Sequence, residues 1–589
     1  MSDKKEKKKS LDWTLLKRVL STAYPYKYLF LFCILLPIIL APVTTIRPYL
    51  VKVMVDNHIL KEDLEGLGFM AMLFVGAVIL DAMLRYTFIY TTALLGQSVI
   101  KDMRVRVFKH ITNLRLKYFD KTAIGTATTR TISDIEAINN VFAQGVITIF
   151  GDILIVIAVI CVMFYTSWIL TLISLVTLPF LIIATYIFKE KVKATFQVVR
   201  SQISKMNAFL QERITGMNVV QIFNAEKREA AKFKEINRAY TQANLDSVFY
   251  YAVFFPVVEL ITTISLALMI WLGARAYLQD YVSFGSLVAF PLFLNLLFRP
   301  VRMLADKFNT LQMGLVAADR VFDVLDDNSI IEDAGTIVAQ DIKGKVDFEN
   351  VSFAYDDKNY VLNDISFTLN PGETLAIVGS TGSGKSTIIN ILNRFYEIQS
   401  GTIKVDGVDT KEYTLDSLRS SVSMVLQDVF LFNGTVLDNI TLRDESISKE
   451  KVITASKQIG ADVFIQALPG GYDFKVTERG SNLSVGQRQL ISFVRALVFD
   501  PTILVLDEAT ASIDTETEAI IQYAIEKLIA KRSAVIIAHR LSTIRHANNI
   551  MVLDKGRIVE FGPHDELMQL EDGKYRQLHD MQFTEEELV

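Results

Sequence analysis

The residues with the clearest capacity for chemistry form a glycine-rich segment in the second half of the chain. Residues 379–386 read GSTGSGKS and fit the phosphate-binding pattern G-x-x-x-x-G-K-[ST], directly after a predicted strand that ends at Val378. Glycines let backbone N–H groups close around phosphates, Lys385 can reach the β- and γ-phosphates, and the Ser386 hydroxyl can bind Mg²⁺. One such match can arise by chance, so a second element is needed. The residues expected to contact a nucleotide are Gly379, Ser380, Thr381, Gly382, Ser383, Gly384, Lys385, Ser386 and Thr387, where a helix opens.

Two carboxylates follow a predicted buried strand further along the chain. Residues 503–508 read ILVLDE, an apolar run typical of a parallel strand that ends in Asp507 and Glu508. Asp507 can hold Mg²⁺, and Glu508 is placed to polarise a water molecule for in-line attack on the γ-phosphate. The alternative is an acidic pair that caps a helix. Together with the glycine-rich segment, the pair indicates a nucleoside triphosphatase.

A third motif lies between these two. Residues 483–487 read LSVGQ, which resembles the signature L-S-G-G-Q of the ATP-binding cassette (ABC) superfamily. The resemblance covers nearly the whole chain and implies that Ser484, Gly486 and Gln487 bind the ATP held by a second subunit. Val485 stands where the family pattern has glycine, a departure that leaves the serine, the second glycine and the glutamine in place. The resemblance implies ATP and Mg²⁺ as cofactors and ATP hydrolysis as the reaction.

Further positions match the family one at a time. Tyr355 resembles the aromatic residue on which adenine stacks, with an ordinary strand tyrosine as the alternative. Gln427 resembles the glutamine that senses Mg²⁺ and the attacking water, and His539 resembles the histidine that contacts the γ-phosphate. Asp514 belongs to a segment that resembles the loop through which paired cassettes communicate, and residues 477–480, TERG, resemble a coupling element of exporters. The resemblance thus implies catalytic roles for Glu508, His539, Gln427 and Lys385, and metal binding by Ser386, Gln427 and Asp507.

Apolar residues are concentrated in the first half of the chain. They make up 51% of the 589 residues, while charged residues fall to 21%, which departs from the average soluble protein. A helix needs about 20 apolar residues to cross a bilayer. The runs that satisfy this are Tyr28–Ile46, Gly66–Ile100, Asn139–Phe188, Val248–Ala274 and Tyr281–Phe298, the third being two spans with a polar break at residues 165–168. We predict six transmembrane helices. A signal peptide is a poor alternative for the first run, because no small-residue cleavage site follows it.

Basic residues in the connections predict the orientation, because Lys and Arg accumulate on the cytoplasmic side. Residues 101–130 contain eight of them and residues 189–238 contain eleven, whereas residues 57–65 contain only Lys61. Both termini are therefore expected in the cytoplasm. Apolar residues recur at helical spacing in both basic connections, so we expect the membrane helices to continue into the cytoplasm and reverse in short turns. A separate cytoplasmic helical hairpin is the alternative. In the family, the turns at about Tyr118–Thr129 and Thr215–Ala225 would be coupling helices.

After about Asn328, short β-rich strands alternate with helical segments, which is typical of an α/β domain with a mostly parallel sheet. The expected fold is an all-α six-helix transmembrane domain followed by an α/β P-loop NTPase domain of the ABC type. The expected parts are 1–27 (tail and elbow helix), 28–315 (membrane domain), 316–343 (linker) and 344–589 (cassette). Two cysteines, Cys33 and Cys161, can build neither a disulfide framework nor a zinc cluster.

Several charged side chains lie at membrane depth, where an unpaired charge costs at least about 2.5–3.5 kcal/mol. For most of them pairing between helices is the expected explanation, for example an aspartate with Arg85. Glu259, near the middle of the fifth span, is expected to face the cavity, where it could attract a cationic substrate, and pairing is its alternative. The other charges of this kind are Asp81, Asp152, Arg299 and Arg302.

The leading functional interpretation is an ATP-driven exporter or flippase of hydrophobic or amphipathic compounds, such as drugs or lipids. Because cassettes of this family act in pairs, the resemblance implies a second half-transporter subunit. We expect a homodimer, with a heterodimer as the alternative, because the chain retains every catalytic position. An ATP-gated regulatory membrane protein and a peptide exporter are the competing functions, and an importer is disfavoured because importers carry the cassette on a separate chain. We expect a multi-pass protein of a bacterial inner membrane; the net charge of −4 argues against a nucleic-acid partner.

Overall fold

The chain folds into two compact units. The computed structural model describes residues 12–331, 333–356, 359–507, 515–537 and 544–586. One unit comprises Met1–Asn113 and Thr122–Asn328, and the other comprises Leu114–Lys121 and Ser329–Val589. The short segment Leu114–Lys121 therefore belongs to the second unit, although it lies in the first part of the sequence. We call the two units the membrane unit and the cassette.

The membrane unit consists of helices, as the apolar runs predict. Over the described residues, six helical stretches are long and apolar enough to cross a membrane, which confirms the expected six spans. The third stretch, Ile124–Thr166, is built from several shorter helices in series. The helices are α1 (Trp13–Ser21), α2 (Lys27–Val53), α3 (Leu64–Thr112), α5 (Ile124–Thr129), α6 (Ile135–Asn140), α7 (Ile147–Thr166), α8 (Trp168–Leu175), α9 (Leu178–Thr215), α10 (Met217–Ile222), α11 (Glu226–Tyr277) and α12 (Phe284–Leu325).

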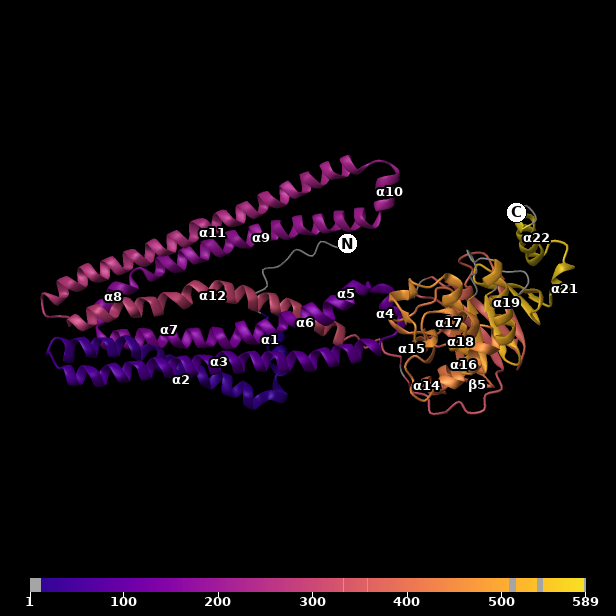
Figure 1. Ribbon diagram of the computed structural model, residues 1–589, viewed down its shortest axis with the longest axis horizontal. Coiled ribbons are helices and arrows are strands. Elements are labelled where there is room, and N and C mark those ends of the chain that lie inside the picture. The colour runs from indigo at the N-terminus through magenta and orange to yellow at the C-terminus, as the bar shows by residue number, and fades with distance from the viewer. Residues whose placement is uncertain (1–11, 332, 357–358, 508–514, 538–543, 587–589) are drawn as a thin grey trace. The chain divides into compact units, whose positions relative to one another are not determined.

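The long basic connections are extensions of the spanning helices. The third and fourth spans are separated at Ser167, whose extended backbone ends α7 and whose hydroxyl caps α8. Helices α9 and α11 then run side by side as a long hairpin closed by α10 (Figure 1). In the second connection, the two spanning helices therefore continue past the apolar segments and reverse in a short turn, and they do not form a separate hairpin domain. Helix α12 continues to Leu325, so the first part of the segment 316–343 is helical.

An ion pair joins α1 to the residue that follows α12, the last helix of the membrane unit. Leu16 and Val19 of α1 are buried, whereas Trp13 is 74% exposed, so the helix is amphipathic. Arg18 donates two hydrogen bonds, of 2.6 and 2.7 Å, to the Asp326 carboxylate, and its guanidinium lies 4.1 Å from the centre of the Phe322 ring. This pairing lowers the pKa of Asp326.

Asp81, Arg85 and Asp152, three of the charges predicted at membrane depth, are paired. Asp81 of α3 is buried and accepts a hydrogen bond of 2.6 Å from the Thr44 hydroxyl of α2. Arg47 Nη1 lies 3.4 Å from one oxygen of this carboxylate, and Arg85 Nη2 lies 3.5 Å from the other. The expected pairing of an aspartate with Arg85 is thus confirmed, and Arg47 joins it. A second pair, between Asp152 of α7 and Lys307 of α12, ties two spans together.

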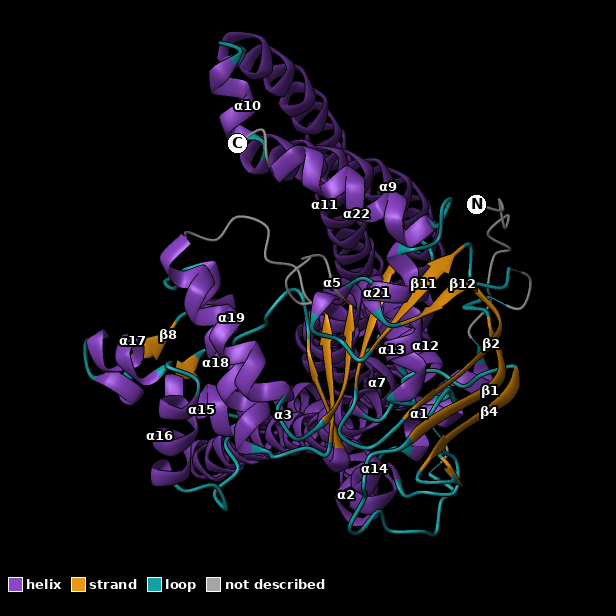
Figure 2. Ribbon diagram, turned by 90° about the vertical axis from the view of Figure 1, so that its right-hand side faces the viewer, coloured by secondary structure: helices purple, strands orange, loops and turns teal. Residues whose placement is uncertain are grey.

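Over its described residues, the cassette is built around two large sheets, with a third, two-stranded sheet of β7 and β8 (Figure 2). The larger sheet has the order β12-β11-β3-β10-β9-β6, in which only β12 runs antiparallel to its neighbour, and the smaller antiparallel sheet has the order β2-β1-β4-β5. The strands are β1 (Val346–Phe353), β2 (Leu362–Leu369), β3 (Thr374–Gly379), β4 (Ser400–Val405), β5 (Val408–Asp409), β6 (Val422–Val425), β7 (Gly434–Thr435), β8 (Lys475–Val476), β9 (Ile503–Asp507), β10 (Ser533–Ile537), β11 (Asn549–Asp554) and β12 (Arg557–Gly562).

Helices and hydrophobic cores complete the cassette. One core is formed by the two large sheets together with α13, and another lies between the larger sheet and the helices around α18. This α/β architecture confirms the expected fold class. The helices are α4 (Leu116–Lys121), α13 (Lys385–Leu392), α14 (Leu415–Ser421), α15 (Val436–Thr441), α16 (Lys449–Gln458), α17 (Asp462–Ala467), α18 (Val485–Val498), α19 (Thr515–Ile529), α21 (His564–Met568) and α22 (Lys574–Glu586).

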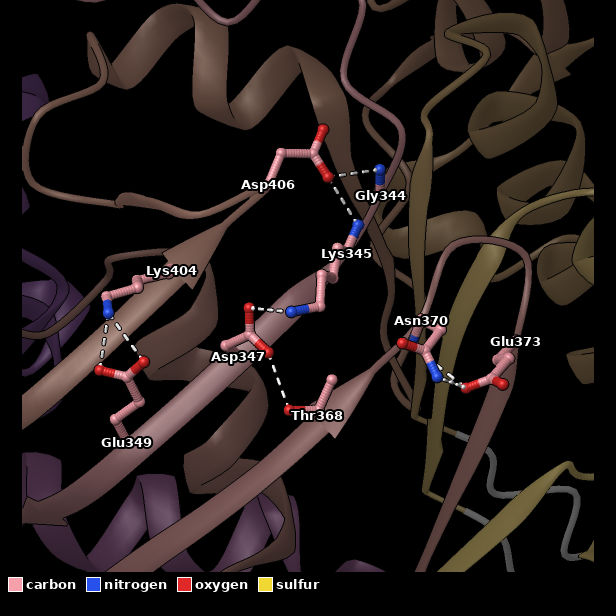
Figure 3. A network of polar contacts seen from close by, with 9 residues as sticks. All are labelled: Gly344, Lys345, Asp347, Glu349, Thr368, Asn370, Glu373, Lys404 and Asp406. Atoms are coloured by element: carbon pink, nitrogen blue, oxygen red, sulfur yellow. Dashed lines mark hydrogen bonds and ion pairs between the residues drawn. The ribbon is translucent and has the colours of Figure 1, made fainter.

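The Asp406 carboxylate fixes the backbone where the chain enters β1 of the smaller sheet (Figure 3). Asp406, in the turn after β4, accepts hydrogen bonds from the backbone N–H groups of Lys343, Gly344 and Lys345, at 2.5, 3.1 and 2.8 Å. Across the neighbouring strands, the Lys404 ammonium donates to both oxygens of Glu349, each at 2.7 Å. These contacts hold β1 against β4 at the start of the cassette.

The buried carboxylate of the membrane unit provides a stability test. Asp81→Asn keeps an acceptor for Thr44 but removes the counter-ion of Arg47 and Arg85. Because breaking a buried pair leaves an uncompensated charge, we expect a loss of about 1–3 kcal/mol and a lower Tm in thermal unfolding of the detergent-purified protein.

The matched control is Glu136→Gln, which breaks the exposed pair with Arg104, whose side chains are 43% and 48% exposed. Exposed pairs contribute less than about 1 kcal/mol, so Tm should barely change. Equal losses in the two variants would contradict the structural importance of Asp81.

Candidate functional site

The glycine-rich segment forms a loop between the carboxyl end of β3 and the start of α13. Gly379, Gly382 and Gly384 have positive φ angles of 153°, 81° and 109°, which L side chains rarely adopt. A Cβ atom at Gly379 would also lie 2.3 Å from the carbonyl oxygen of Leu553 on the neighbouring strand β11. Both constraints explain why this turn needs glycine, and the result is a backbone loop of the kind that surrounds phosphate groups.

The Lys385 ammonium lies inside this loop. Lys385 is 9% exposed, and its Nζ donates hydrogen bonds of 2.7 Å to the Gly379 carbonyl and 3.0 Å to the Ser380 carbonyl. Burial lowers the pKa of Lys385, and the nearby Asp507 carboxylate acts in the opposite direction. The Ser383 hydroxyl is buried and has no hydrogen-bond partner among the described residues. A cation and a free hydroxyl are thus placed where a nucleotide phosphate can bind.

The predicted carboxylate strand shares an edge of the sheet with this loop. Strand β9 ends at Asp507 and runs parallel to β10 and β6, while β10 also pairs in parallel with β3. Parallel strands end at the same edge, so Asp507, the phosphate loop and the segment after β6 with the exposed Gln427 are on one side of the cassette. The expected positions Glu508, Asp514 and His539 lie outside the described residues.

The expected adenine-binding tyrosine contacts the helix that follows the loop. The Tyr355 hydroxyl lies 3.2 Å from Thr387 Oγ1, near the start of α13. Its ring meets Phe353 edge-on, with centroids 4.9 Å apart, and meets Tyr396 in the same way at 5.0 Å. The structure therefore brings Tyr355 and Thr387 together, and it adds Tyr396, which the sequence analysis did not single out.

The signature segment forms the amino-terminal cap of α18. The Ser484 hydroxyl accepts from the Gln487 N–H at 3.2 Å, and the Gln487 side chain accepts from the Ser484 N–H at 3.0 Å. This reciprocal pair is a capping box. Val485 is the first helical residue of α18 and does not have a positive φ, so its backbone does not need the freedom of glycine. Within the described part of the cassette, no hydrogen bond joins Ser484 or Gln487 to the phosphate loop.

The described residues do not form a preassembled cluster of metal-binding side chains. Among the described residues, no group of three His, Cys, Asp or Glu side chains could hold a metal ion. Ser386 is exposed at the start of α13, and its hydroxyl and the Asp507 carboxylate are hard oxygen donors of the type that Mg²⁺ prefers. Such a site would be completed by Gln427, nucleotide phosphates and water.

Comparisons with known proteins agree with this geometry. Residues 30–301 match the family model of the ABC transporter transmembrane region, and residues 362–511 match the ABC transporter model. The chain is 38% identical to the "Probable multidrug resistance ABC transporter ATP-binding/permease protein YheH" of Bacillus subtilis, over 88% of this chain and 77% of that protein. It is 34% identical to an "ATP-dependent lipid A-core flippase" of Desulfotalea psychrophila, over 96% of this chain and 99% of that protein.

A solved structure extends the similarity to the whole fold. A bacterial Atm1-family ABC exporter with ATP bound superimposes with a TM-score of 0.77 and 29% sequence identity, over 97% of this chain and 99% of that chain. One membrane unit and one cassette make this chain a half-transporter. With its phosphate loop, its strand ending in Asp507 and its six spans, the chain is a multi-pass membrane ATPase that belongs to the ABC transporter family, with the architecture of an exporter.

Proposed function

We propose that this protein is a homodimeric exporter or flippase that uses ATP hydrolysis to move hydrophobic or amphipathic compounds, drug-like molecules or lipids, across a bacterial inner membrane. The observation that carries the proposal is the pairing of a phosphate loop containing Lys385 with six apolar spans in one chain. The relatives named for multidrug resistance and for lipid A-core flipping support a substrate of this chemical class. The basic connections support a cytoplasmic cassette and cytoplasmic termini.

The roles of the site residues follow from their chemistry. Lys385 and the loop amides bind the β- and γ-phosphates, Tyr355 takes the adenine ring, and Glu508 accepts a proton from the water that attacks the γ-phosphate. His539 and Gln427 contact the γ-phosphate and the attacking water. Ser386, Gln427 and Asp507 would hold Mg²⁺, which neutralises phosphate charge when it is bound. Ser484, Gly486 and Gln487 complete the site of the second subunit, with Asp514 at the junction of the two cassettes.

The helix cap formed by Ser484 supports the proposal that the signature segment binds the ATP of the second subunit. In a helix, the first N–H groups have no partner in the preceding turn and point outward with positive potential. The N–H of Gln487 is occupied by the capping box, but those of the first turn around Gly486 remain available for an anion. A γ-phosphate presented by the other cassette is an anion of the right kind. The site is thus incomplete in one chain and complete in a pair.

The proposed base is tested with Glu508→Gln, which removes the proton acceptor and keeps the shape of the side chain. We expect MgATP binding to persist while ATPase activity falls by about 10²–10⁴-fold. The control is Glu526→Gln on the exposed face of α19, which should hydrolyse ATP at the parental rate. Normal turnover in Glu508→Gln would contradict the assigned base.

The proposed cationic substrate preference is tested at Glu259. This carboxylate is exposed on α11 in the single chain, in an otherwise apolar stretch, and a negative charge there would attract a cation. We expect Glu259→Gln to reduce the transport of a cationic amphiphile in proteoliposomes by about tenfold and to spare a neutral one.

The control for this test is Asp280→Asn, in the outer turn after α11, where asparagine tolerates the φ of 58°. It removes the same charge and should leave the transport of both compounds unchanged. Unaltered transport of the cation by Glu259→Gln would show that Glu259 does not face the substrate.

The homodimer is tested by expressing the chain alone. The chain has a mass of 66.4 kDa, so we expect a protein mass close to twice this value by light scattering in detergent, together with ATPase activity. A monomer without activity, or activity that appears only after a different half-transporter is added, would favour the heterodimer.

A further inference from the structure

A continuous row of side-chain contacts connects the segment Leu114–Lys121 with the nucleotide site. Although this segment follows α3 in sequence, it belongs to the cassette. The Arg115 N–H donates to the Ser329 carbonyl at 2.9 Å, and its Nε donates to the Ile330 carbonyl at 3.0 Å. At the other end of the segment, Asp120 of α4 accepts a hydrogen bond from the Tyr396 hydroxyl.

Tyr396 is a buried residue in the loop that follows α13. It is 8% exposed. Burial, together with the hydrogen bond to Asp120, raises the pKa of Tyr396, so its hydroxyl stays protonated at neutral pH and remains a donor. A hydrogen bond to a carboxylate in such a place is stronger than one between neutral groups. The contact thus holds α4 firmly to the cassette at this point.

The ring of Tyr396 lies against the aromatic residue proposed to take the adenine ring. Tyr396 and Tyr355 meet edge-on, with centroids 5.0 Å apart and an angle of 88° between the ring planes. Phe353 meets both rings, at 4.9 Å from Tyr355 and 5.8 Å from Tyr396. The Tyr355 hydroxyl contacts Thr387. Edge-to-face packing is attractive and directional, so this trio fixes the orientation of Tyr355 from several sides.

We propose that Tyr396 is a positioning residue for nucleotide binding: its ring holds Tyr355 in the orientation that receives the base, and its hydroxyl ties that orientation to Asp120 of α4. The inference rests on the proposed function, in which Tyr355 stacks on adenine. Because coupling between two sites is reciprocal, base binding then strengthens the attachment of α4, and attachment of α4 strengthens base binding. A residue that only fills the core would affect stability and every part of the nucleotide alike.

The test separates the base from the phosphates. All variants carry Glu508→Gln, so that ATP is bound and not hydrolysed, and calorimetry of the full-length protein in detergent measures binding of MgATP and of magnesium tripolyphosphate, which lacks base and sugar. We expect Tyr396→Leu to weaken MgATP binding by about tenfold and to change tripolyphosphate binding by less than about twofold.

The hydroxyl is tested separately with variants that keep the aromatic ring. Tyr396→Phe and Asp120→Ala should each weaken MgATP binding by about threefold, and the double variant should show no further loss, because both remove one shared hydrogen bond. The matched control is Tyr472→Phe. Tyr472 is likewise a buried tyrosine of the cassette, and its hydroxyl donates to Asp462 at 2.7 Å. The Tyr472→Phe protein should bind MgATP and magnesium tripolyphosphate like the parent.

Two results would overturn the inference: equal weakening of both ligands in Tyr396→Leu, or unchanged MgATP binding in Tyr396→Phe and Asp120→Ala. If Tyr396→Leu does not fold, Tyr396→Phe and Asp120→Ala decide alone.

The variant Tyr355→Leu distinguishes failure of the positioning role from failure of the proposed function. Weaker MgATP binding in Tyr355→Leu with normal binding in the Tyr396 variants would refute only the positioning role, whereas normal binding in Tyr355→Leu would refute the adenine assignment as well.

Discussion

The free-energy cost of removing a charge from water governs both units of this protein. In the membrane unit it requires Asp81 to lie between Arg47 and Arg85, and Asp152 to pair with Lys307. In the cassette the same cost acts on Lys385, whose ammonium is held by two loop carbonyls. Carbonyl dipoles compensate a buried cation only in part, and phosphate oxygens compensate it better. The arrangement that keeps the loop folded therefore also favours a nucleotide in it.

Local features of the sequence predict the elements well, because hydropathy and turn chemistry act over a few residues. The six spans, the break at Ser167 and the glycine loop are of this kind. The partners of the membrane charges cannot be predicted in this way, because nothing in the sequence links Asp152 to Lys307, which is 155 positions away. The pairing of Asp81 with Arg85 could be predicted because the two lie one helical turn apart.

In the candidate site, too, some features follow from local sequence and others depend on contacts between distant residues. The phosphate loop and the strand ending at Asp507 follow from short patterns, and the sheet order places them at one edge. The capping box could also have been found, since serine with glutamine three positions later is a known helix-start pattern. It explains why valine is compatible with the signature, which the family pattern alone leaves open. Tyr396 carries no local signal, because its importance comes from packing between distant segments.

Because Leu114–Lys121 folds with the cassette, the boundary between the two functional parts of the chain is not a single point in the sequence. A cassette produced from Ser329 onward would lack α4 and would expose the Tyr396 hydroxyl that Asp120 accepts from. The same reasoning applies to inheritance. A recombination event that exchanges cassettes with a relative keeps this contact only where the new cassette also carries a hydroxyl donor opposite Asp120.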